Sequence, residues 1–351
     1  MDVFAPEKAD SVLFIVDVPH ATPDDNEWKE RREMAARWHS AMLELSKEIG
    51  FSLFPVACYQ DVAQHNNSLP DIFEVEGDWI KAKTLAESAS LVIAFSKWSA
   101  TAPLHEWVHL YKGLRAASLP GVTPYMESTA LAADYAQVAS YCRILQPKLD
   151  AAEAAFVRFS TGDELLLDLR WRNAQVDDGV LHPTQAGKVI NLPSGEVFST
   201  FYEGERKEAD SLTNGVLPIV WNGSIVSLLI EHNTVVDILS DADGGIRKFL
   251  EEDEARKNLA ELGLGCNPAA VVTGHILEDE KVGPHIALGR SDHLGGTVGP
   301  AAFKLKPWHQ DFAYTKKGSV FIESMVFTGS GLGSETIISR GNYSRHLNIP
   351  I

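Results

Sequence analysis

The chain has 351 residues, of which 45% are hydrophobic and 23% are charged, as in ordinary globular proteins. This length suggests two domains and allows a sizeable core to form without disulfides or metals. The formal net charge of -17 at pH 7 makes nucleic acids and anionic membrane surfaces unfavourable partners.

Three features of the sequence predict a cytoplasmic location. The three cysteines lie far apart, so they predict neither a disulfide framework nor a zinc-knuckle spacing. The first eight residues lack the basic region and apolar run of a signal peptide. No apolar stretch approaches the roughly 18 residues that a membrane span needs.

The first half of the chain predicts a parallel α/β scaffold. Strands are expected at residues 11–18, 51–57, 90–95 and 122–125. Helices are expected at residues 25–49, before Gly50, and at 129–155, with an interruption at Pro147. The sequence after the first strand lacks a dinucleotide fingerprint and a phosphate-binding loop, so this half is expected to be a scaffold or a dimer surface.

The pattern becomes β-rich after about residue 155, which predicts an α/β domain at 1–155 and an α+β domain at 156–351. Turns are expected at Asn222-Gly223 and at residues 241–245, and one helix is expected at 245–263. Short strands are expected at residues 156–159, 164–171, 216–220, 224–231 and 235–239.

Side chains that bind metals collect in this second half, where four of the twelve histidines fall between residues 275 and 309. Glu196 follows a Pro/Gly turn, and Glu261 and His285 are set in apolar, glycine-rich sequence. A carboxylate among apolar neighbours is costly to bury unless it is paired or bound to a metal. His309 and Asp311 form an H-x-D pair, and an extended segment would place both side chains on one face.

Three carboxylates and two imidazoles suit Zn, Co, Mn or Fe(II). Five ligands are too few for two closed sites, but they suffice for two ions that share a bridging carboxylate. Each residue taken alone has an ordinary alternative. Glu196 could be a turn acid, Glu261 a surface residue at a helix end, and His285 a core histidine, while H-x-D pairs also arise by chance.

Four segments, in this order, resemble the dinuclear metallo-aminopeptidases of the aminopeptidase T and AmpS type. The resemblance covers roughly residues 155–330 and rests on NLPSGEVFST (191–200), AELGLGCNP (260–268), EDEKVGPHIALG (278–289) and HQDF (309–312). It implies an α/β N-terminal domain, a C-terminal domain that carries the metals, and a homodimer. The ligands that it implies are Glu196, Glu261, His285, His309 and Asp311, with Glu280 as a general base or further ligand.

The sequence departs from this family at two points. Its N-terminal half does not look like the usual family sequence. The family also has a tyrosine seven residues after the ligand histidine, where this chain has Asp292, followed by His293, as in a shorter archaeal-type branch. We expect His293, or else Asp292, to replace the tyrosine near the metals, since a histidine can donate a hydrogen bond. A surface turn is the alternative for this segment.

The resemblance implies a metal-dependent hydrolase, most simply an aminopeptidase that releases N-terminal residues from small peptides through a metal-activated water. Two divalent ions per chain (Zn, Co or Mn) are expected, with Glu280 moving the proton. A more distant resemblance to 2,5-dihydroxypyridine 5,6-dioxygenases gives the alternative, a ring-cleaving enzyme. One Fe(II) would then be held by His309, Asp311 and either His285 or Glu261. The full set of five ligands favours the hydrolase over this enzyme and over a non-enzymatic binding protein.

Overall fold

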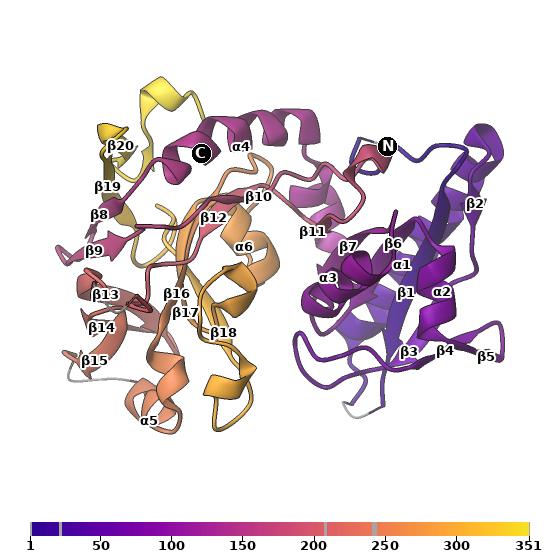
Figure 1. Cartoon of the computed structure of the whole chain (residues 1–351), viewed down its shortest axis with the longest axis horizontal. Helices are drawn as coiled ribbons and strands as arrows, with labels where there is room; N and C mark the ends of the chain where they lie inside the picture. Colours follow the sequence, from indigo (N-terminus) through magenta and orange to yellow (C-terminus); the bar gives the residue numbers. More distant parts are fainter. Residues whose placement is uncertain (1, 21–22, 207–208, 241–243, 351) are drawn as a thin grey trace. The chain divides into compact units, whose positions relative to one another are not determined.

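A computed structural model describes residues 2–20, 23–206, 209–240 and 244–350, so residues 241–243 of the expected turn lie outside the described residues. The fold is a mixed α/β structure with several sheets (Figure 1). It divides into two compact units, one formed by residues 1–139 and 177–194 and the other by 140–176 and 195–351. Among the described residues, no helix combines the length and apolarity needed to cross a membrane.

The first unit is built on a mostly parallel sheet of order β11-β7-β6-β1-β3-β4-β5, with β2 paired to β1 (Figure 1). The two antiparallel pairs are β3 with β4 and β4 with β5. The strands are β1 Ser11–Val18, β2 Ser52–Leu53, β3 Ala57–Gln60, β4 Ile72–Val75, β5 Asp78–Lys81, β6 Leu91–Ser96, β7 Arg115–Pro120 and β11 Val189–Asn191. The helices are α1 Asn26–Ile49, α2 Ala82–Ser88, α3 Thr101–Leu110, η1 Pro124–Ser128, η2 Ala130–Ala132 and η3 Pro183–Gln185.

Local sequence explains most of these elements. The expected strand at 11–18 is confirmed, and α1 ends where predicted, because Gly50 adopts φ 92° and donates from its N–H to the Ser46 carbonyl. The expected strand at 51–57 is split into β2 and β3 around Pro55, which lacks a donor for the ladder. The strand expected at 122–125 is wrong, because Pro124 begins a 3-10 helix and β7 lies earlier, in alanine-rich sequence.

The second unit contains two sheets built mainly of antiparallel pairs (Figure 1). The larger has the order β15-β14-β13-β9-β8-β19-β20-β21 and the smaller β10-β12-β16-β17-β18. The larger sheet comprises β8 Ala154–Phe159, β9 Glu164–Asp168, β13 Asn214–Trp221, β14 Ser224–Glu231, β15 Thr234–Ile238, β19 Ile322–Gly329, β20 Gly333–Ser339 and β21 Asn342–Tyr343. The smaller comprises β10 Gln175–Asp177, β12 Glu196–Ser199, β16 Leu259–Gly265, β17 Pro284–Gly289 and β18 His309–Ala313.

The helices of this part of the chain are short, apart from α4 Tyr135–Asp150, which lies within the helix expected at 129–155. This helix continues through Pro147, so the interruption expected there is wrong. The others are α5 Ile246–Glu251, η4 Glu254–Lys257, α6 Ile276–Val282, η5 Asp292–Leu294, η6 Pro300–Ala302 and η7 Arg345–Leu347. The helix expected at 245–263 is wrong beyond Glu251. Residues 259–265 instead form β16, in which Leu262 and Leu264 alternate with Gly263 and Gly265 at the period of a strand.

Candidate metal centre

The smaller sheet of the second unit has one apolar face and one face that carries the candidate ligands. The apolar face is buried and includes Val197, Leu262, Leu264, Ile286 and Leu288. On the other face, Glu196 of β12 pairs with Gly265 of β16, and His285 of β17 pairs with Gly263. The next row joins Glu261 of β16, Ala287 of β17 and Asp311 of β18, while His309 pairs with Gly289. Each candidate ligand therefore has a glycine or alanine beside it on the neighbouring strand.

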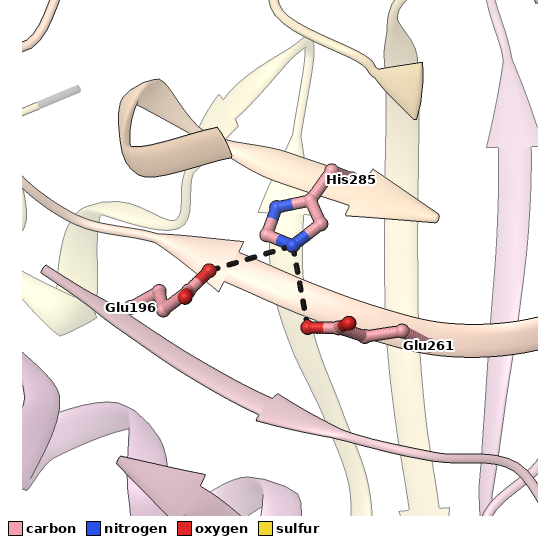
Figure 2. A group of neighbouring side chains, drawn as sticks. All are labelled: Glu196, Glu261 and His285. Carbon is pink, nitrogen blue, oxygen red and sulfur yellow. Dashed lines mark ion pairs between the residues drawn. The ribbon is translucent and has the colours of Figure 1, made fainter. Parts of the chain in front are cut away.

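Glu196, Glu261 and His285 form a first group of candidate ligands (Figure 2). His285 Nε2 lies 3.4 Å from Glu196 Oε2 and 3.6 Å from Glu261 Oε1. Gly263 makes room for the ring, since a Cβ there would stand 2.0 Å from His285 Nε2. All three residues are buried.

Glu261 also belongs to a second group, with His309 and Asp311. Its Oε2 lies 3.3 Å from His309 Nε2, which is 3.4 Å from Asp311 Oδ1. His309 Nδ1 donates to the Arg290 carbonyl at 2.7 Å, and this bond leaves Nε2 as the nitrogen that faces the carboxylates. The structure thus brings together the five residues singled out in the sequence, and one carboxylate is common to both groups.

The charges of this cluster are strongly coupled. Burial alone would lower the pKa of His285, but the carboxylates of Glu261, Glu196 and Asp311 outweigh it and raise this pKa to about 10. Burial would also lower the pKa of His309, but the carboxylates of Asp311 and Glu261 outweigh it and raise this pKa well above its usual value. Burial would raise the pKa of Glu261, yet the two histidines hold it below its usual value.

These residues fit a divalent cation. Among the described residues, Glu196 Oε2 and both ring nitrogens of His285 are buried without a hydrogen-bond partner. Buried polar atoms are rarely left in this state, and a cation that displaces the His285 proton would satisfy the atoms that converge in the first group. Carboxylate oxygens and imidazole nitrogens are the donors that Zn, Mn, Co and Fe(II) accept.

Glu280 lies beside the centre on α6, in the segment Glu278–Lys281. Four consecutive charged residues, 278–281, are typical of a solvent-exposed segment, but here Glu278 and Lys281 are fully buried. Burial raises the pKa of Glu280 to about 8, and the negative charges of Glu196 and Asp311 add to this effect. Lys281, which the sequence analysis did not single out, places its Nζ 2.5 Å from both Glu280 Oε1 and Glu196 Oε1.

The segment that follows β17 carries the two residues expected to replace the family tyrosine. The His293 ring lies 5.2 Å from the His309 ring, centroid to centroid, and its side chain is 23% exposed. Asp292 instead pairs with Arg290, whose Nε donates to Oδ1 at 2.5 Å. His293 therefore lies beside a candidate ligand, as an exposed residue of a short 3-10 turn.

A further acid missed in the sequence holds this segment in place. Glu203 accepts from Asn258 Nδ2 at 3.0 Å, from the Thr297 N–H at 2.5 Å and from the Ser291 hydroxyl. Asn258 Nδ2 also donates to the Gly289 carbonyl at 3.0 Å. These bonds fix both ends of the loop whose Arg290 carbonyl orients His309. No local motif marks Glu203, because its partners lie 55 to 94 residues away in sequence.

No protein-family model matches the sequence, and neither does any curated protein sequence. The fold is similar to 2,5-dihydroxypyridine dioxygenase from Pseudomonas putida, with a TM-score of 0.63 and 15% identity over 96% of this chain and 92% of that chain. It is also similar to AmpT from Thermus thermophilus, a metallo-aminopeptidase, with a TM-score of 0.57 and 15% identity over 96% of this chain and 95% of that chain. The comparisons support the fold family and leave the reaction open.

Proposed function

We propose that the protein is a metal-dependent hydrolase, an aminopeptidase that acts on small peptides. The observation that carries this proposal is the shared position of Glu261, which belongs to both ligand groups. Two ions could be held side by side by Glu196 and His285 on one side and by His309 and Asp311 on the other. Zn, Co or Mn would suit these donors.

Bound divalent ions at such a site supply Lewis acidity, which polarises a carbonyl oxygen and lowers the pKa of a coordinated water towards about 7. The chain's own residues would handle the proton and the developing charge. Glu280 lies beside the centre in a buried position that raises its pKa above the usual value, which suits it to take up a proton and return it. His293, beside His309, could donate a hydrogen bond to a substrate oxygen.

A mononuclear Fe(II) dioxygenase is the second candidate, because the fold is similar to 2,5-dihydroxypyridine dioxygenase along nearly the whole chain. His309 and Asp311, with His285 or Glu261, would supply two imidazoles and one carboxylate, or one imidazole and two carboxylates. A single iron held in this way would not use Glu196 as a ligand, although this buried carboxylate faces His285. The hydrolase therefore accounts for more of the site.

Metal analysis of protein purified without added metal tests the two functions directly. The hydrolase predicts two Zn, Co or Mn ions per chain and release of N-terminal residues from dipeptides and tripeptides. One iron per chain, with oxygen consumption in the presence of a dihydroxypyridine, would rule out the hydrolase and support the dioxygenase. We further propose a homodimer, which light scattering of the purified protein would test.

A further inference from the structure

Lys281 is a buried cation of the candidate centre, and the proposed function leaves its role open. Its side chain is 0% exposed. The ammonium contacts one oxygen of Glu196 and one oxygen of Glu280, both at 2.5 Å. A buried lysine is costly unless its charge is paired, so a lysine at this position needs a reason.

The position of Lys281 is built into the backbone of the sheet. Gly265 pairs with Glu196, and a Cβ at Gly265 would stand 2.3 Å from the Glu280 carbonyl oxygen and 2.6 Å from the Lys281 carbonyl carbon. The Gly265 N–H donates to the Gly283 carbonyl at 2.9 Å, and the Asn267 N–H donates to the Lys281 carbonyl at 3.0 Å. The end of α6 is thereby held against β16, next to Glu196.

The contact with Lys281 gives the two oxygens of Glu196 different environments. Oε1 accepts from Lys281, whereas Oε2 is buried without a hydrogen-bond partner among the described residues and lies 3.4 Å from His285 Nε2. Glu196 therefore offers one oxygen to the ligand group. Glu280 likewise has Oε1 committed to the ammonium. Without the ammonium, both carboxylates would have two oxygens available to a cation.

We propose that Lys281 is a positioning residue that separates the ligand carboxylate from the carboxylate that moves protons. It holds Glu196 as a ligand through a single oxygen, and it holds Glu280 beside the centre but outside the ligand set. This inference rests on the metal centre of the proposed function and, for the role of Glu280, on the proton transfer proposed there.

The d–d absorption of bound Co²⁺ tests this role, because it weakens as the coordination number rises. In Lys281→Met, Glu196 and Glu280 are released towards the ion, so the absorbance per bound Co²⁺ should fall below that of the wild type. Lys281→Arg keeps the positive charge, so its absorbance per bound Co²⁺ should be close to that of the wild type. The double variant Lys281→Met, Glu280→Gln should regain part of the lost absorbance, since an amide is a poorer ligand than a carboxylate. Lys257→Met is the matched control, because that lysine pairs with Glu254 in η4.

A second measurement protects the test against misfolding of Lys281→Met. Glu280→Gln alone should leave the Co²⁺ spectrum unchanged, because Glu280 is outside the ligand set. A changed spectrum in this variant, or an unchanged spectrum in folded Lys281→Met, would overturn the assignment. Wild-type protein that binds Co²⁺ but cleaves no peptide would remove the proposed hydrolase activity and leave this comparison of spectra intact.

Discussion

Each unit of the molecule contains a buried carboxylate, and the two differ in how many of their oxygens have hydrogen-bond donors. In the first unit, Asp17 accepts from Trp28 Nε1 at 2.7 Å and from the Lys97 N–H at 2.8 Å, so both oxygens have donors. In the second unit, Glu196 has one oxygen on Lys281 and the other without a hydrogen-bond partner among the described residues. Burial of an acid therefore does not identify a functional site. An unsatisfied oxygen that faces other metal-binding side chains is a better indicator of one.

The same contrast holds for the sheets that carry these acids. Ligands of α/β folds usually bind at the carboxyl ends of parallel strands. Asp17 lies near the carboxyl end of β1, but its donors come from α1 and from the residue after β6, so it ties local structure together. The candidate ligands stand instead on the face of an antiparallel sheet, in adjoining rows of the ladder.

The strongest test of this comparison neutralises one buried acid in each unit, Glu261 in the second and Asp17 in the first. Glu261→Gln should lose both ions and lower turnover by more than about 100-fold, since even residues that only support ligands contribute about 10- to 100-fold. Asp17→Asn should keep the wild-type metal content. Metal analysis by mass spectrometry and circular dichroism would check both variants. Metal loss in Asp17→Asn alone would reverse the assignment of the two acids.

The pH dependence of metal affinity should be the next largest effect. Without an ion, the pKa of His285 is raised to about 10, so its ring carries a proton at neutral pH that a metal must displace. Affinity should therefore rise with pH, roughly tenfold per pH unit for each proton displaced, and level off above about pH 10. Calorimetry in buffers of different ionisation enthalpy would count the protons. Binding without proton release would contradict this expectation.

Glu280→Gln sharpens the comparison by removing an acid of the centre that is not placed as a ligand. We expect kcat to fall by roughly 10²–10⁴, the usual range for general acid–base catalysis, while the metal content stays at the wild-type level. Steady-state kinetics and metal analysis on the same preparation would test this. Unchanged turnover with metal bound would assign Glu280 a purely structural role.

His293→Ala should have a somewhat smaller effect on turnover. A donor to developing negative charge contributes about 2.7–4 kcal/mol, so kcat should fall by roughly 10²–10³ with little loss of metal. The acid limb of the pH–rate profile should also move. Wild-type behaviour of this variant would indicate that the changed motif serves a different substrate instead.

Asp17 should make the stability of the fold depend on pH. We expect this dependence to have no effect on the metal centre. Burial raises the pKa of Asp17 from 3.8 to about 6, so the folded state holds this proton more tightly than the unfolded chain. Its contribution to stability is present below about pH 4 and is lost as the pH rises through about 6. Relative to Asp17→Asn, the wild type should lose about 3 kcal/mol of unfolding free energy across this interval. Denaturant titrations at pH 4 and pH 8 would measure the difference.

The sequence predicted the candidate ligands because their chemistry is unusual where they stand. Glu261 and His285 are polar residues in apolar, glycine-rich sequence, and the strand period of β18 explains why His309 and Asp311 share a face. Lys281 could not be found in this way. Its segment has the composition of a solvated surface, and its burial depends on the contact of α6 with Gly265, which only the fold creates.

The small residues of the ligand face have a consequence for the sequences that this sheet tolerates. Central strands usually favour β-branched and aromatic side chains, yet here such residues would displace ligands: a Cβ at Gly263 alone would overlap the His285 ring. Strand propensity and the site thus make opposite demands at alternate positions of β16 and β17. A laboratory library that varies Gly263 together with His285 and selects only for stability should replace both by apolar residues that fill the same space, whereas one that selects for metal binding should keep Gly263 and His285.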